Sequence, residues 1–342
     1  MKITLTYNLK REDPHKPADY FSEFDKFTTV KAIASALESK GHSICLLDVE
    51  KVDSIAHFRN HPTDIVFNIA EGRDTQFRES EIPALLNILD IPHTGSGAFA
   101  LAVALDKVMT KKILLSEGIP TPKFQIFDSG KEELNPQLNF PLIVKPNREG
   151  SSKGIGMFSV VNDRERLYAI MREVLAKYRQ EVLVEEFIEG KELTVGIMQN
   201  GKINALPILE IDFSSCNKSG EYFYSWRMKE YQGDSALGLT PTFYCPARLD
   251  QDIEMKVKEI AIKAHQAIGC RDISRVDLRL GKDNIPYVLE INPLPGLDPE
   301  ESNFTLMART AGFKYEDLIE AILLSAIERQ DKIAKLAPES LN

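Results

Sequence analysis

Residues 274–292 read SRVDLRLGKDNIPYVLEIN and give the clearest structural signal in the chain. Apolar and polar residues alternate on both sides of a turn at residues 281–284, which is typical of a β-hairpin. If the hairpin is symmetric about Asp283 and Asn284, its apolar side chains face a core and its polar side chains share the opposite face. The segment therefore predicts two antiparallel strands with one chemically distinct face.

The polar face of this hairpin gathers two acids, an amide and an arginine. In the symmetric register Asp277 lies opposite Glu290, and Arg275 lies opposite Asn292. Oxygen donors of this kind suit Mg²⁺, and an arginine suits a phosphate or a developing oxyanion. We predict a metal site at Asp277, Glu290 and Asn292. The alternative is a solvated, salt-bridged strand face, which the apolar neighbours on both strands disfavour.

A glycine- and serine-rich loop, NREGSSKGIG at residues 147–156, follows a short buried strand expected at 141–146. Such loops can point several backbone N–H groups at a phosphate, and Lys145 adds a cation beside the loop. The pattern matches neither the P-loop nor the GxGxxG fingerprint. The loop therefore predicts a phosphate cradle of another kind, with an ordinary surface turn as the competing interpretation.

The rest of the chain reads as further strands and helices. Strands are expected at residues 2–7, 43–48, 64–69, 182–188, 192–198 and 203–211, and helices at 26–40, 80–89, 98–117, 163–179, 251–268 and 315–335. The order of the first five elements predicts a small parallel α/β domain. Residues 328–342 read as a charged, frayed tail with no assigned function.

Composition excludes several classes of protein. A chain of 342 residues with 43% hydrophobic residues predicts two or three domains with sizeable cores. No apolar run is long enough to cross a membrane, and the first residues lack the apolar core of a signal peptide. The net charge of −9 argues against nucleic-acid binding, and four scattered cysteines fit a reducing compartment. We expect a cytoplasmic enzyme.

Taken together and in order, the motifs resemble those of the D-alanine–D-alanine ligase family of the ATP-grasp superfamily. The segments that carry the resemblance are HTGSG (93–97), LDK (105–107), IVKPNREGSSKGIG (143–156), VEEFIEGKELTVG (184–196), YSWRMKE (224–230), CPA (245–247), GCRDISRVDLRL (269–280) and VLEINPLPGL (288–297). The match extends over about residues 60–325 and is weaker before them.

The resemblance implies a mixed α/β chain with an ATP-grasp fold behind an N-terminal parallel α/β pre-ATP-grasp domain. The implied divisions are residues 1–97, an N-terminal domain on the substrate side; 98–188, a central ATP-grasp subdomain with the glycine-rich loop; and 189–342, a C-terminal ATP-grasp subdomain with the lid and the metal site. ATP is expected between the last two.

The resemblance also implies an ATP-dependent carboxylate–amine ligase. In this family a carboxylate attacks the γ-phosphate of ATP, an amine attacks the resulting acylphosphate, and an amide, ADP and phosphate are released. The implied cofactors are ATP and Mg²⁺, with Mn²⁺ as an alternative ion. The implied partners are small amino-acid or peptide substrates, with neither nucleic acid nor a membrane. A homodimer is common in the family, although no feature of this sequence shows an interface.

The family's functional residues carry over one by one. For the nucleotide, Lys107 and Lys145 match the phosphate-binding lysines, and Ser151 and Ser152 match the loop that closes over the phosphates. Glu185, Phe187 and Ile188 match the adenine-side positions. Glu192 matches the acid that binds the ribose, and Lys229 matches the lysine of the mobile lid. Asp277, Glu290 and Asn292 match the metal ligands, and Arg275 the arginine that stabilises the acylphosphate. The backbone N–H of Gly296 matches an oxyanion donor, so the implied catalytic group is Arg275, Ser151, Gly296 and Lys229.

The amino-acid half departs from the family pattern. The usual His-Gly after the third strand is Glu71-Gly72 here, so we expect Glu71 near the first substrate, where it would accommodate a cationic group. Ser302 lies near the place of a Ser-Leu pair that normally takes the second substrate's carboxylate, although the alignment is shifted. Glu12 and Glu23 are candidates to replace the family's glutamate for the first amino group, although their spacing does not match the family pattern.

Several functions remain open at this point. The ligase could form D-alanyl-D-alanine or join other amino acids or peptides, and the altered positions favour the latter. A non-catalytic nucleotide-binding module is disfavoured by the intact polar cluster around Arg275. A small-molecule kinase is disfavoured by Gly296, because a kinase needs no donor for a tetrahedral carbon centre. The residues do not select the acyl donor, the amine acceptor, their stereochemistry or the pathway.

Overall fold

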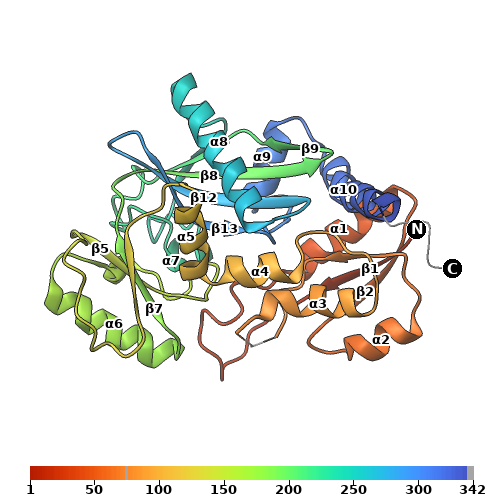
Figure 1. Ribbon diagram of the computed structural model, residues 1–342, viewed down its shortest axis with the longest axis horizontal. Helices are drawn as coiled ribbons and strands as arrows, with labels where there is room; N and C mark the ends of the chain where they lie inside the picture. The colour runs from red at the N-terminus through yellow and green to blue at the C-terminus, as the bar shows by residue number, and fades with distance from the viewer. Residues whose placement is uncertain (74–75, 337–342) are drawn as a thin grey trace.

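The computed structural model describes residues 1–73 and 76–336. Within this part of the chain the strands form three sheets, each from a separate stretch of sequence. In Figure 1 the sheet that contains β8, β12 and β13 lies between the other two. Of the helices in the described residues, none is long and apolar enough to cross a membrane.

The first sheet is parallel, as its sequence pattern predicts. It contains β1 (Lys2–Tyr7), β2 (Ser43–Asp48) and β3 (Ile65–Asn68) in the order β2-β1-β3. Helix α1 (Phe27–Ser39) covers one face, and α2 (Ser54–Asn60) and α3 (Glu81–Ile88) cover the other, with the 3₁₀ helix η1 (Arg78–Ser80) just before α3. Helix α2 was not predicted from the sequence, because it is only two turns long and largely polar.

The second sheet is antiparallel and lies next in the chain. It contains β4 (Phe124–Phe127), β5 (Leu142–Pro146), β6 (Val160–Val161) and β7 (Val182–Glu186) in the order β4-β7-β5-β6. Helix α6 (Arg164–Tyr178) packs its apolar face on this sheet, and a short 3₁₀ helix, η2 (Met157–Ser159), precedes β6. The glycine- and serine-rich loop runs between β5 and η2.

The third sheet carries the predicted hairpin. It contains β8 (Gly190–Asn200), β9 (Lys202–Ala205), β10 (Leu209–Asp212), β11 (Thr242–Tyr244), β12 (Ile273–Gly281) and β13 (Pro286–Asn292). The strand order is β11-β10-β8-β12-β13, with β9 paired to β8, and every pairing is antiparallel. The single strand expected at 203–211 is thus two strands, because Pro207 cannot donate to the ladder.

Helices cover both faces of the third sheet. Helices α4 (Ala98–Leu105), α5 (Lys107–Ser116) and α8 (Gln251–Ile268) share one core with it, and α9 (Asn303–Thr310) and α10 (Tyr315–Leu336) share another with it and α1. The helix expected at 98–117 is two helices, because the extended Asp106 ends α4 and caps α5 through Met109 N. Residues 328–336 are helical rather than frayed, and 337–342 lie outside the described residues.

The hairpin register is confirmed where the polar cluster lies. Arg275 pairs with Asn292 and Asp277 pairs with Glu290. Beyond Asp277 the register shifts by one residue at a β-bulge, so Leu278 pairs with Val288. The symmetric register was therefore wrong for the inner part of the hairpin, although the apolar side chains there are buried as expected.

Candidate active site

A cavity of about 480 Å³ is lined by residues from each of the three stretches of sequence that form the sheets. The candidate site residues predicted from the sequence, apart from Glu12, line this cavity. They include Lys107, Lys145, Ser151, Ser152, Glu185, Phe187, Ile188, Glu192, Lys229, Arg275, Asp277, Glu290, Asn292, Gly296, Glu71 and Ser302. The structure thus brings together residues that are scattered over most of the sequence, and their individual roles stay predictions.

The centre of the site is Asp277, which accepts hydrogen bonds from three side chains. Arg275 binds it in a bidentate manner, with Nε 2.9 Å from Oδ1 and Nη2 2.7 Å from Oδ2. Thr194 Oγ1 donates to Oδ1 at 2.6 Å, and Asn292 Nδ2 donates to Oδ2 at 3.0 Å. Burial opposes the ionisation of Asp277, but the charge of Arg275 outweighs it and holds the pKa of this carboxyl below its usual value.

The donor chemistry of this cluster fits a magnesium ion. Asp277 and Glu290 supply carboxylate oxygens, and Asn292 uses its amide nitrogen on Asp277, which leaves its carbonyl oxygen for a ligand. Among the described residues no three His, Cys, Asp or Glu side chains are grouped to hold a metal by themselves. A set of two carboxylates and one amide fits the coordination preference of Mg²⁺, which binds one or two carboxylates and completes its shell with water and phosphate oxygens.

The two predicted phosphate lysines are held by buried acids. Lys107 Nζ lies 3.4 Å from Glu290 Oε2 and also donates to the carbonyl of Glu149. Lys145 forms an ion pair with Glu185, which is fully buried. Glu185 was expected on the adenine side, and the structure shows that its carboxylate also orients a lysine.

Lys111 completes this network, and it was not predicted from the sequence. Its Nζ lies 2.7 Å from Glu185 Oε2 and donates to Thr121 Oγ1 at 2.7 Å. Burial lowers the pKa of Lys111 to about 8, although the negative charge of Glu185 acts to raise it. The signal that could have found it is its spacing of four residues from Lys107, which puts both lysines on one face of α5.

Arg279 is a second missed residue, on the side where adenine and ribose are expected. Its Nη1 donates to Glu192 Oε2 at 2.9 Å, and its guanidinium lies 4.7 Å from the centre of the Phe187 ring. Arg275, Asp277 and Arg279 alternate along β12, so they share the face that meets the cavity. This alternation in the sequence could have identified Arg279 as a residue of the site.

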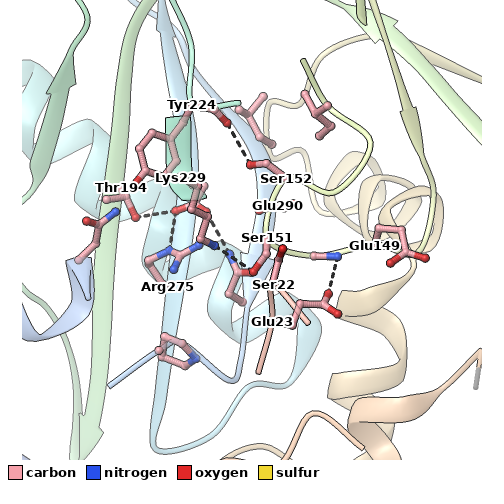
Figure 2. Close-up of a pocket in the computed structure, with 18 of the residues that line it drawn as sticks. Ser22, Glu23, Glu149, Ser151, Ser152, Thr194, Tyr224, Lys229, Arg275 and Glu290 are labelled. Atoms are coloured by element: carbon pink, nitrogen blue, oxygen red, sulfur yellow. Dashed lines mark hydrogen bonds and ion pairs between the residues drawn. The ribbon is translucent and has the colours of Figure 1, made fainter. Parts of the chain in front are cut away.

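The glycine-rich loop and the lid segment meet over the cavity, as Figure 2 shows. Lys229, on α7 (Trp226–Glu230), donates from Nζ to Ser151 Oγ at 3.1 Å. Ser152 Oγ donates to the Tyr224 carbonyl at 3.0 Å. Both serines have positive φ angles, 50° and 55°, a strained conformation for a residue other than glycine. This backbone turns their hydroxyl groups toward the lid.

The N-terminal segment closes the outer side of the same loop. Glu23 Oε1 accepts hydrogen bonds from Gly150 N at 2.7 Å and from Arg78 Nη2 at 2.6 Å, and Lys153 Nζ donates to Oε2 at 2.9 Å. Glu23 therefore holds the loop, and both of its oxygens already accept hydrogen bonds from the protein. Glu12 is exposed and does not line the cavity. The structure therefore does not bring Glu12 to the cavity, and a substrate role for Glu23 stays a prediction.

The substrate end of the cavity contains Gly296 and Ser302. Ser302 Oγ accepts a hydrogen bond from Asp298 N at 2.9 Å, which folds the loop before α9. A Cβ atom on Gly296 would lie 3.0 Å from Ser302 Oγ, so this glycine allows the two segments to approach closely. Glu71 lines the same cavity from the segment after β3.

Comparisons with known proteins identify the family to which this chain is similar. A family model described as D-ala D-ala ligase C-terminus matches residues 113–324. The D-alanine–D-alanine ligase of Carboxydothermus hydrogenoformans is 35% identical over 314 residues, which are 89% of this chain and 94% of the relative. An uncharacterized Sinorhizobium fredii protein, y4sG, is 33% identical over 302 residues, which are 85% of each chain.

A solved structure shows the same fold. The D-alanine–D-alanine ligase of Bacillus anthracis complexed with ATP matches with a TM-score of 0.74 and 24% identity, over 97% of this chain and 99% of that chain. The architecture is therefore the ATP-grasp fold with an N-terminal parallel α/β domain. With the family model and the sequence relatives, this places the chain in the D-alanine–D-alanine ligase family of ATP-grasp enzymes.

Proposed function

We propose that this ATP-grasp ligase joins a carboxylate to an amine through an acylphosphate, with release of ADP and phosphate. The observation that carries the proposal is the convergence of Arg275, Asp277, Lys107, Lys145 and the backbone of Gly296 on one cavity. Phosphoryl transfer depends mainly on positioning and charge neutralisation, which these groups supply.

The nucleotide is proposed to lie along the second and third sheets. Lys107, Lys145 and Lys229 would neutralise its phosphates, with Ser151 and Ser152 donating from the closed loop. Phe187 and Ile188 would contact the adenine ring, and Glu192 would accept from the ribose hydroxyls. The pairing of Arg279 with Glu192 supports the last role, because it keeps that carboxylate oriented toward the cavity.

A magnesium ion is proposed at Asp277, Glu290 and Asn292, where it would neutralise phosphate charge; Mn²⁺ has similar ligand preferences. Arg275 would stabilise negative charge on the acylphosphate and on the tetrahedral centre, with the Gly296 N–H as a second donor. The lid around Lys229 and the loop at Ser151 would exclude water, because an acylphosphate hydrolyses readily.

The proposed domain division follows the sheets. Residues 1–97 contain β1 to β3, residues 98–188 contain β4 to β7, and residues 189–342 contain β8 to β13. We also propose a cytoplasmic site of action, because ATP is abundant there and the four cysteines are unpaired. A homodimer rests on the family resemblance alone.

Relatives named D-alanine–D-alanine ligase make D-alanine the first substrate to test. The departures at Glu71 and near Ser302 favour another amino acid or a peptide. The test is release of ADP and phosphate with ATP and Mg²⁺ across pools of D- and L-amino acids, with products identified by mass spectrometry. We expect ADP, phosphate and an amide in equal amounts.

Asp277→Asn is expected to abolish this turnover, whereas Asp252→Asn, on the exposed surface of α8, is expected to leave it unchanged. A stable phosphorylated product without free phosphate would instead establish a kinase. Absence of turnover with every pool would leave a nucleotide-binding module and contradict the proposal.

A further inference from the structure

Three carboxylates at the N-terminal side of the cavity have no partner among the residues that the structure describes. Asp25 precedes α1, Glu71 follows β3, and Glu79 lies in η1, and all three line the cavity. Over the described residues none of these side chains makes a hydrogen bond or an ion pair. We call these three residues the acid row.

The cations that border the acid row are engaged elsewhere. Arg78 donates to Glu23 at 2.6 Å and to the Arg148 carbonyl at 3.1 Å. Lys107 pairs with Glu290 and the Glu149 carbonyl. Lys26 pairs with Glu301 at 2.6 Å. Each cation therefore has its own partner, and none of the three forms an ion pair with the acid row.

Leaving these acids unpaired is costly. Glu71 and Glu79 are half-buried, and both line the cavity. Burial, with repulsion from Asp298, raises the pKa of Asp25 to about 7, and burial, with repulsion from Glu79, raises the pKa of Glu71 well above its usual value. Buried carboxylates of this kind are stabilised by a cation that binds between them.

The geometry argues for an organic cation. No three acids of the described residues are grouped closely enough to hold one metal ion. Contacts of neighbouring residues order the row instead. Arg78, next to Glu79, donates to the Arg148 carbonyl in the glycine-rich loop at 3.1 Å, and Thr29, in the first turn of the helix that follows Asp25, donates to Asp298 Oδ2 at 2.7 Å. The row thus extends from the phosphate end of the site to the loop before α9, as an extended substrate would.

We propose that the acid row binds the acyl-donor substrate, and that this donor is a basic amino acid with a side-chain ammonium or guanidinium besides its α-ammonium. A single α-ammonium would leave two of the three carboxylates without a counter-ion. The reacting carboxylate would lie at the Lys107 end, where phosphate is transferred, and the side-chain cation would lie near Asp25. This inference rests on the proposed ligase function and specifies its substrate class.

Matched amino acids test the proposal directly. Arginine is compared with citrulline, and lysine with norleucine, in D and L forms, with ADP release and dipeptide sequence measured. We expect kcat/KM for each basic amino acid to exceed that of its neutral counterpart by about tenfold or more. We also expect the basic residue at the amino end of the dipeptide, which is the acyl-donor position.

Variants connect the preference to the acid row. Glu71→Gln is expected to lower the arginine-to-citrulline ratio of kcat/KM about tenfold with KM for ATP unchanged, and Asp25→Asn provides the same test if Glu71→Gln does not fold. Glu38→Gln, exposed on α1, is the matched control. Equal or better use of neutral donors would overturn this inference and leave the ligase standing. No amide with any donor would overturn the proposed function itself.

Discussion

The Nζ atom of Lys111 lies 2.7 Å from Oε2 of Glu185, and neither side chain is open to solvent. The second oxygen of Glu185 pairs with Lys145, which lines the cavity. The network therefore connects helix α5 to strands β7 and β5. Lys111 does not itself line the cavity, and it acts as a positioning residue for Lys145 through Glu185.

Lys111→Met should destabilise the fold and weaken ATP binding. Removing one partner of a buried ion pair costs about 3–5 kcal/mol, and the value here should fall at the low end because Glu185 keeps Lys145. Urea unfolding measures the first effect, and KM for ATP, with kcat less affected, measures the second. Lys112→Met, at the exposed neighbouring position, is the control, and a loss equal to that of the control would remove Lys111 from this role.

Gly72→Ala should disturb the substrate end of the cavity more than the nucleotide end. Gly72 has φ of +80°, and a Cβ there would lie 1.9 Å from the Arg78 carbonyl oxygen, so Arg78 and its neighbour Glu79 must move. We expect KM for the amino-acid substrate to rise about tenfold, with a smaller change in KM for ATP.

Gly118→Ala separates the steric effect from backbone strain. Gly118 also has a positive φ, +67°, but its Cβ would meet open space, so only a strain of about 1–2 kcal/mol is expected. If both variants leave the amino-acid KM unchanged, the close approach of Gly72 to Arg78 does not shape the substrate site.

Trp226 should report closure of the lid. It is the single tryptophan of the chain, and its Nε1 donates to Ser22 Oγ at 2.8 Å, so the structure shows the lid against the N-terminal segment. Acrylamide quenching of its fluorescence should decrease when ADP, Mg²⁺ and the amino-acid substrate are added. Quenching that is the same with and without ligands would mean that the lid is closed throughout.

His265 should contribute a defined pH dependence to stability. Burial lowers the pKa of His265 to about 4, and its Nδ1 lies 2.7 Å from Ser274 Oγ. The unfolded chain binds a proton near pH 6.5 and the folded chain does not, so the contribution is complete above pH 6.5 and is lost as the pH falls toward 4.

Urea unfolding at pH 7.5 and 4.5 measures this effect. Between these values His265→Asn should lose about 2.5 kcal/mol less free energy of unfolding than the unmodified protein does. The raised pKa values of Asp25 and Glu79 act in the opposite direction in both proteins, and the comparison cancels them. An identical pH dependence in the two proteins would contradict the assignment.

The hairpin could be predicted because its evidence is local. The alternation of apolar and polar residues along 274–292 and the polar turn were enough to pair Asp277 with Glu290. The β-bulge after Asp277 was not predicted. Helices α7 and α9 could not be predicted in the same way, because one or two turns show no reliable periodicity.

The missed parts of the site depend on long-range contacts. From the sequence alone, a lysine on a helix is expected to be exposed to solvent. Lys111 is buried only because β7 packs nearby and places Glu185 beside it. The same holds for the acid row. Asp25 and Glu79 belong to no recognisable sequence motif, and only the folded structure shows that they line one cavity. Glu71 was found because it departs from the family pattern at a recognisable position.

The central claim is that a carboxylate is activated as an acylphosphate in this cavity. Turnover with an amino acid labelled with ¹⁸O in its carboxylate tests this most directly, with the released phosphate analysed by mass spectrometry. Attack of the labelled carboxylate on the γ-phosphate, followed by displacement by an amine, must transfer one ¹⁸O to each phosphate. Unlabelled phosphate accompanied by amide formation would contradict the account.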